Sequence, residues 1–131
     1  MFLDQAEKRR TAVTTLLGDL VHTPSLSSEE EDVTRRLVHE MTELGYDEVT
    51  VDGFGNVIGR IGTGPVTILY DSHVDTVGVG SRDEWSQDPF EPVLRGGIMY
   101  GRGASDDKGG ISSMIHGGAL YKQLARRLTA P

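Results

Sequence analysis

Hydrophobic residues at helical spacing predict three helices in this chain. In residues 4–22 they are Val13, Leu16, Leu17, Leu20 and Val21, and before Gly45 they are Val33, Leu37, Met41 and Leu44. A third set follows Lys108 and consists of Ile111, Met114, Ile115, Gly118, Ala125 and Leu128. Apolar side chains three or four residues apart form one stripe on a helix, and that stripe needs a surface to cover it. The pattern therefore predicts three amphipathic helices packed against a sheet.

The ends of the first two helices also have sequence signals. Pro24 is expected to end the first helix, and Gly45 the second. Ser27 and Ser28 are each followed three residues later by a glutamate, so one of them is expected to cap the second helix. The acidic residues 29–32 could form a cation site, but acids in a first helical turn are favoured by the helix dipole. We favour this second reading.

Alternating and continuous apolar segments predict the strands. Residues 46–52 alternate valines with polar neighbours, which indicates a half-buried strand that turns into residues 56–61. Residues 92–95 and 98–100 predict a hairpin around Gly96-Gly97. Residues 66–70, Val-Thr-Ile-Leu-Tyr, form a nearly continuous apolar run, which is typical of a strand buried on both faces. This order of elements predicts an α/β sandwich with at least one parallel pairing.

Composition narrows the function class. The 131 residues suit one small domain, and a net charge of -7 argues against a nucleic-acid-binding protein. No apolar run reaches membrane-spanning length, and the first residues lack the order of a signal peptide, so we expect a cytoplasmic protein without a membrane partner. The chain has no cysteine. Any metal must therefore be bound by His, Asp or Glu, which suits zinc, with manganese or cobalt as alternatives.

Candidate chemistry follows the apolar run 66–70. His73 and Asp75 come just after it, and side chains two apart in an extended segment point the same way. An imidazole and a carboxylate placed together suit a zinc ligand and the group that orients it. Asp106 follows Gly101-Arg102-Gly103 and precedes the third helix. A carboxylate in such a position can bridge two metal ions.

Other polar and aromatic residues have simpler explanations. Trp85 and Phe90 could contact a substrate, but aromatic residues in a loop more often anchor that loop, and we favour anchoring. Arg102 could approach a substrate carboxylate or pair with a nearby acid, so it stays outside the predicted site. The third helix places His116 on the side of Ser112, away from the apolar stripe, which predicts a surface histidine.

Three ordered motifs carry a family resemblance. They are His73-Val74-Asp75-Thr76, the loop Glu84-Trp85-Ser86-Gln87-Asp88-Pro89-Phe90-Glu91-Pro92, and Tyr100-Gly101-Arg102-Gly103-Ala104-Ser105-Asp106-Asp107-Lys108-Gly109. Together they resemble the zinc metallopeptidase and amidohydrolase family of acetylornithine deacetylase, succinyl-diaminopimelate desuccinylase and glutamate carboxypeptidase. The resemblance implies a three-layer α/β/α sandwich of the zinc-peptidase type. It also implies hydrolysis of an amide bond in a small N-acyl amino acid or peptide by a hydroxide bound to two zinc ions.

The resemblance assigns roles to three residues. It implies that His73 binds the first metal, that Asp75 is the catalytic-site residue steering the imidazole, and that Asp106 bridges both metals. It also implies a cis peptide bond between Asp106 and Asp107.

The family's glutamate pair, its remaining metal ligands and its inserted dimerisation domain have no counterpart in this sequence. We therefore expect residues 1–131 to be the amino-terminal part of a catalytic domain, with the rest of that domain and the dimerisation domain absent, and the isolated chain to show little turnover. A homodimer is expected only for the full-length protein.

Two alternatives remain open. A non-catalytic metal-binding or interaction domain could keep the fold without the chemistry. A phosphate-binding module is suggested by Gly101-Arg102-Gly103, but the third glycine of a dinucleotide fingerprint is missing, and Lys108 is not preceded by the glycine of a P-loop. Metal titration separates the first alternative from the second.

Overall fold

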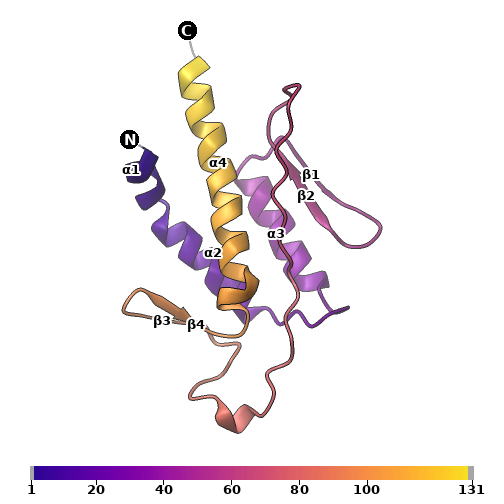
Figure 1. Cartoon of the computed structure of the whole chain (residues 1–131), viewed down its shortest axis with the longest axis vertical. Helices are drawn as coiled ribbons and strands as arrows, with labels where there is room; N and C mark the ends of the chain where they lie inside the picture. The colour runs from indigo at the N-terminus through magenta and orange to yellow at the C-terminus, as the bar shows by residue number, and fades with distance from the viewer. Residues whose placement is uncertain (1, 130–131) are drawn as a thin grey trace.

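Helices form most of the regular structure. The computed structural model of the chain describes residues 2–129, with side chains through residue 125. Within these residues the α-helices are α1 (Phe2–Glu7), α2 (Arg10–His22), α3 (Glu31–Glu43) and α4 (Gly109–Thr129). Helix α2 contacts both α3 and α4, and α4 is the long central helix of the molecule (Figure 1). The three predicted amphipathic segments are thus helical, with the first divided into α1 and α2.

Two antiparallel strand pairs accompany the helices. β1 (Glu48–Val51) pairs with β2 (Val57–Arg60), and β3 (Val93–Arg95) pairs with β4 (Ile98–Tyr100). In the second pair Gly96 and Gly97 have φ of 59° and 83°, which is the two-residue turn that a tight hairpin requires. The predicted hairpin is therefore confirmed.

The hydrophobic core lies where α2, α3 and α4 meet the inner face of β1–β2. Its buried members are Leu16, Leu20, Val33, Leu37, Met41, Ile111 and Ile115. Leu44, Tyr46, Val49, Val57 and Val74 pack against them and are partly buried. Most of these are the apolar positions that the helical and alternating patterns predict. Leu128 of the predicted third stripe lies outside the described side chains.

The start of α3 differs from the prediction. Neither serine caps it: the residue before the helix is Glu30, and Ser28 has a φ of 74°, whereas a capping serine needs an extended backbone. The Ser27 hydroxyl instead donates to the Asp75 carboxylate at 2.6 Å. At the other end Gly45 has a φ of 73° and its N–H bonds to the Thr42 carbonyl, as expected of a helix terminator.

The apolar run 66–70 is extended but is not a buried strand. Val66, Leu69 and Tyr70 are 81%, 85% and 73% exposed. Among residues 2–129 no neighbouring strand hydrogen-bonds to this run, and the described parallel pairing is the single bridge between Leu26 and Thr76. A central strand is buried only when strands flank it and helices cover it. The architecture is thus mixed α/β, and a three-layer sandwich is not formed within the described residues.

The predicted surface position of His116 is wrong. His116 is 3% exposed and Ser112 is fully buried, because α4 packs on α2 along one side and receives Tyr46 on another, so more than one stripe is covered. His116 Nε2 lies 3.2 Å from Glu40 Oε1 without hydrogen-bond geometry, and Arg36 reaches the same carboxylate. Burial lowers the pKa of His116, and nearby arginines lower it further while Glu40 opposes them.

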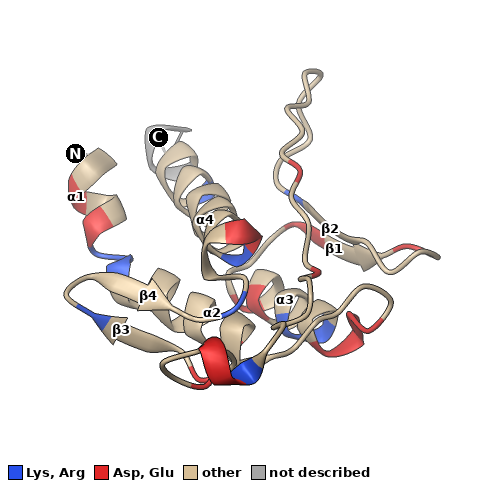
Figure 2. Ribbon diagram, turned by 60° about the horizontal axis from the view of Figure 1, so that its bottom comes forward, with Lys and Arg blue, Asp and Glu red and all other residues tan. Residues whose placement is uncertain are grey.

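Charged side chains lie mainly at element ends. Acidic residues occur at the start of α3, in the single turn η1 (Arg82–Glu84) and in the turn η2 (Ala104–Lys108) before α4 (Figure 2). The acidic residues at the start of α3 pair with Arg35 of their own helix, which agrees with the helix-dipole reading. Within residues 2–129 no helix is long and apolar enough to cross a membrane.

Candidate metal site

The segment that carries His73 is fixed to the loop after α2. The Thr76 N–H donates to the Ser25 carbonyl at 2.7 Å, and the Ser25 hydroxyl donates to the Val74 carbonyl at 2.8 Å. Ser25 and Thr76 are buried, while Val74 turns toward the core. These contacts leave His73 and Asp75 on the outer side of the segment, as the period of two predicts.

The turn η2 brings Asp106 to the same place. Gly103 has a φ of 78°, and a Cβ atom there would lie 2.6 Å from the Thr76 Cγ2, so this backbone approaches the His73 segment closely and needs glycine. Asp106 is not helical, with φ of −129° and ψ of 93°. The peptide bond between Asp106 and Asp107 is cis, as the family resemblance implies.

Lys108 secures the far end of η2. Its side chain is 1% exposed, and Nζ donates to the carbonyls of Leu20 at 2.6 Å and Thr23 at 2.8 Å. These carbonyls lie at the carboxyl end of α2, where helical hydrogen bonds run out. Burial lowers the pKa of Lys108 to about 8. Sequence reasoning missed this role, because an isolated lysine normally indicates a surface position.

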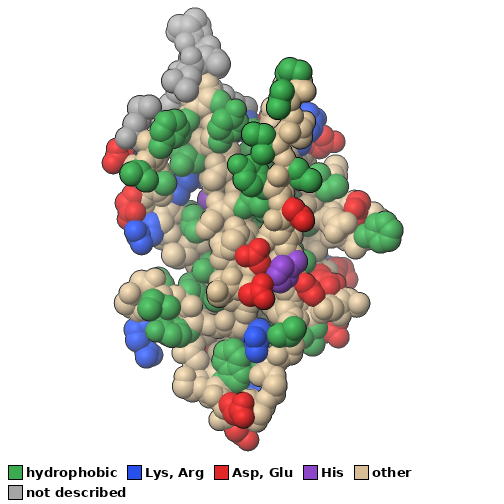
Figure 3. Space-filling model, viewed as in Figure 1, with side chains coloured by type: hydrophobic (Ala, Val, Ile, Leu, Met, Phe, Trp, Pro, Cys, Tyr) green, Lys and Arg blue, Asp and Glu red, His purple; other side chains and the backbone are tan. Residues whose placement is uncertain are grey.

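His73 lies between two carboxylates. Its Nε2 is 2.9 Å from Asp106 Oδ1, and its Nδ1 is 3.1 Å from Asp75 Oδ1. Asp106 raises the pKa of His73 most, followed by Asp75, while partial burial opposes both. The hydroxyl of Ser27 and then His73 hold the pKa of Asp75 below its usual value. The space-filling view shows an imidazole bordered by acidic side chains on an open face (Figure 3).

This arrangement suits a cation at one side of the ring. A proton on Nδ1 is directed to Asp75, which leaves the Nε2 lone pair of the neutral ring facing the Asp106 carboxylate. The Nε2 lone pair and the Asp106 oxygen are both acceptors 2.9 Å apart, so either a proton or a metal ion must lie between them. Imidazole nitrogen and carboxylate oxygen are zinc donors, so the pair fits part of a zinc site.

The described residues do not complete a metal shell. Asp75 and Asp106 contact opposite nitrogens of His73, so the three groups do not surround one point. Within residues 2–129 no group of three or more His, Asp or Glu side chains could hold a metal ion. The structure thus brings the three predicted residues together but offers two donors on the Nε2 side.

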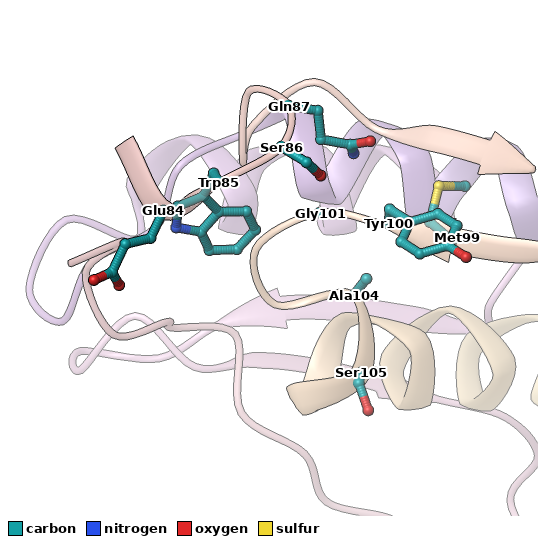
Figure 4. Close-up of a pocket in the computed structure, with 9 residues that line it drawn as sticks. All are labelled: Glu84, Trp85, Ser86, Gln87, Met99, Tyr100, Gly101, Ala104 and Ser105. Carbon is teal, nitrogen blue, oxygen red and sulfur yellow. The ribbon is translucent and has the colours of Figure 1, made fainter. Parts of the chain in front are cut away.

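A shallow pocket lies beside η2. It has a volume of about 400 Å³ and is lined by residues of the Trp85 loop, of β4 and of η2, including Ser105 next to Asp106. The rings of Trp85 and Tyr100 stand at opposite ends of it (Figure 4).

Trp85 and Arg102 hold the pocket loop in place. The Trp85 indole N–H donates to the Val79 carbonyl at 2.8 Å, and the Arg102 guanidinium lies 5.0 Å from the centre of the Trp85 ring. Trp85 therefore anchors its loop, as predicted, while also lining the pocket.

Comparison with known proteins gives a consistent result. The sequence model described as Peptidase family M20/M25/M40 matches residues 69–129. The uncharacterized protein YgeY of Escherichia coli (strain K12) is 40% identical over 124 residues, which are 95% of this chain and 31% of YgeY. Succinyl-diaminopimelate desuccinylase of Bordetella avium is 35% identical over 107 residues, which are 80% of this chain and 28% of that enzyme.

A solved structure shares the fold. The crystal structure of human carnosine dipeptidase 1 superimposes with a TM-score of 0.73 and 20% sequence identity, over 95% of this chain and 31% of that one. The chain therefore spans less than a third of the length of these relatives.

Proposed function

Because this chain belongs to peptidase family M20/M25/M40, we propose that it contributes part of the active site of a zinc-dependent hydrolase of amide bonds. The substrates are small N-acyl amino acids or peptides, a class suggested by the names desuccinylase and dipeptidase of its relatives. The position of His73 between Asp75 and Asp106 carries this proposal.

Each of the three residues has a distinct role in the proposed site. His73 Nε2 and the Asp106 carboxylate would hold metal, and Asp106 would be shared between two ions in the complete enzyme. Asp75 accepts a hydrogen bond from the Nδ1–H of His73 and so keeps the Nε2 lone pair available, while the Ser27 hydroxyl donates to Asp75 in turn. Bound zinc supplies a Lewis acid that polarises the amide carbonyl and lowers the pKa of a bound water.

The exposed run 66–70 supports a proposal about the domain. Large apolar side chains from 73% to 85% exposed are unusual in a chain whose core is otherwise buried. Hydrophobic side chains gather on the upper part of the face shown in Figure 3. We propose that residues 1–131 are the amino-terminal part of a catalytic domain, in which further strands flank this run and complete the three-layer sandwich. The remaining metal ligands and the surface for a homodimer lie in that additional polypeptide.

One observation favours a second function. Because two donors converge within residues 2–129, the chain on its own fits a weak metal-binding or interaction domain without catalysis. Zinc binding alone does not separate the two functions, whereas amide hydrolysis does.

Zinc titration by calorimetry tests the metal site. We expect the chain to bind zinc weakly, and His73→Ala or Asp106→Asn to reduce the affinity at least tenfold. His39→Ala, at an exposed position of α3, is the matched control and should leave the affinity unchanged. Equal zinc binding by the His73→Ala variant would refute the assignment.

A chimera tests the chemistry. In it, the part of this chain that matches the Bordetella avium desuccinylase replaces the corresponding segment of that enzyme, and hydrolysis of succinyl-diaminopimelate is measured with added zinc. We expect hydrolysis by the chimera and its loss in the His73→Ala chimera. A folded, zinc-binding chimera without hydrolysis would favour the non-catalytic function. Substantial turnover by the 131-residue chain alone would contradict the proposal that its site is partial.

A further inference from the structure

The two segments that carry the candidate ligands share a second contact. Ser72 and Asp107 directly neighbour His73 and Asp106 in the sequence, and the Ser72 hydroxyl donates to Asp107 Oδ2. We propose that this pair, the Ser72–Asp107 clamp, is a positioning device that sets the separation of the His73 and Asp106 side chains for metal binding. The inference rests on the proposed function, because it assumes that those two residues bind metal.

Packing alone does not fix the candidate ligands. The His73 side chain is 49% exposed and the Asp106 side chain 89% exposed. The backbone of residues 66–71 has no ladder partner among residues 2–129. A side chain in open solvent keeps its rotamer freedom, so binding a metal through both residues requires their backbones to be held together by other contacts.

Asp107 is well placed to provide that contact. A Cβ atom at Gly110 would lie 2.3 Å from Asp107 Oδ1 and 2.9 Å from its Cγ, so the carboxyl group rests directly on the backbone of the first turn of α4. The side chains of Lys108, just before that turn, and of Ile111, within it, are buried and anchor it. The clamp therefore connects Ser72, at the end of the run 66–71 that lacks a ladder partner among residues 2–129, to the first turn of α4.

The clamp matters most when a metal is bound. In the structure His73 Nε2 and Asp106 Oδ1 contact each other directly. A metal ion held by both atoms would replace that direct contact. Within the described residues, the bond from Ser72 to Asp107 is then the side-chain hydrogen bond that still joins the two segments. Groups that orient metal ligands typically contribute about 10 to 100-fold in metal affinity.

A simpler role for Asp107 is stabilisation of α4 by a negative charge near its start. That role needs the carboxylate but not the Ser72 hydroxyl. Ser72→Ala keeps the charge on Asp107 and removes the hydrogen bond, so it distinguishes the clamp from a helix-dipole effect. Ser72→Thr retains a hydroxyl group and is the conservative variant.

The test is zinc affinity, measured by calorimetry on the 131-residue chain with zinc chloride. We expect Ser72→Ala to weaken zinc binding about tenfold and Ser72→Thr to restore most of the loss. The matched control is Ser113→Ala, whose hydroxyl bonds only within α4, and it should leave the affinity unchanged. The midpoint of urea unfolding in EDTA should differ no more for Ser72→Ala than for Ser113→Ala.

Asp107→Asn and the double variant complete the design. Because both single changes break one bond, their effects on zinc affinity should be clearly less than additive. Unchanged affinity in Ser72→Ala, full additivity, or a parallel fall of the urea midpoint would overturn the clamp. Failure of the parent chain to bind zinc, or equal binding by His73→Ala, would instead overturn the proposed function, so the two failures are distinguishable.

Discussion

The buried ammonium of Lys108 donates to two backbone carbonyls, and we expect its removal to lower the free energy of unfolding substantially. Lys108→Met keeps a side chain of similar length and removes every donor. The Thr23 carbonyl then loses the ammonium donor, and the Leu20 carbonyl keeps the bond from the Thr23 N–H at 3.3 Å. The bond from the backbone N–H of residue 108 to the Gly103 carbonyl at 3.0 Å is kept, so the change tests the side chain alone.

The expected magnitude follows from two opposing effects. A hydrogen bond to a charged group contributes about 1.5 to 3 kcal/mol, and two such bonds are lost. Burial lowers the pKa of Lys108 to about 8 because desolvation disfavours the charged ammonium, and methionine avoids that cost. The loss of the two charged hydrogen bonds outweighs the saved desolvation cost, so we expect a loss of about 2 to 4 kcal/mol in the free energy of unfolding.

Urea unfolding followed by circular dichroism measures this change. With a slope of about 2 kcal/mol per molar urea, the midpoint should fall by about 1 to 2 M. Lys8→Met is the control at an exposed lysine and should stay within about 0.5 kcal/mol of the parent. If Lys108→Met were as stable as this control, the two carbonyls would not depend on the ammonium, and the reasoning would be refuted.

Three further predictions concern the core and the loop before α4. Because burial lowers the pKa of His116, the unfolded chain binds a proton there more readily than the folded chain, and the free energy of unfolding should decrease as the pH falls below the ordinary pKa of 6.5. His116→Gln should flatten that part of the unfolding free energy against pH, and an unchanged slope would contradict it. Tyr46→Phe removes the bond of 2.8 Å to the Ile115 carbonyl, so a urea midpoint corresponding to about 1 kcal/mol less stability is expected, and no change would contradict it. Gly103→Ala places a methyl group 2.6 Å from Thr76 at a positive φ, so it should lower the thermal midpoint, whereas an unchanged midpoint would show that the close approach is relaxed.

Local sequence patterns predicted the structure correctly where a segment's contacts are made with residues near it in the sequence. The stripes of α2 and α3, the glycine turn between β3 and β4, and the terminator Gly45 all follow from spacing and backbone preference. The prediction that Ser27 or Ser28 caps α3 failed although its signal was also local. The Ser27 hydroxyl had a distant competitor in Asp75 that the sequence pattern does not show.

Positions that depend on distant segments were the ones predicted wrongly or not at all. His116 lies off the apolar stripe yet is buried, because α4 is covered on more than one side. Lys108 is buried because the end of α2, more than eighty residues earlier, needs donors. The residue pattern within one segment predicts neither the burial of His116 nor that of Lys108.

The sequence by itself determined the helices, the hairpins, most core positions and the motifs around His73 and Asp106, because these depend on spacing along one segment. Only the tertiary structure decided that Asp75 and Asp106 lie on opposite sides of one imidazole, that Ser27 and Ser72 bond to distant carboxylates, and that residues 66–70 stay exposed. The physical reason is that contact distances and burial depend on which distant surfaces meet, and strand burial in particular requires flanking partners that no property of the strand supplies.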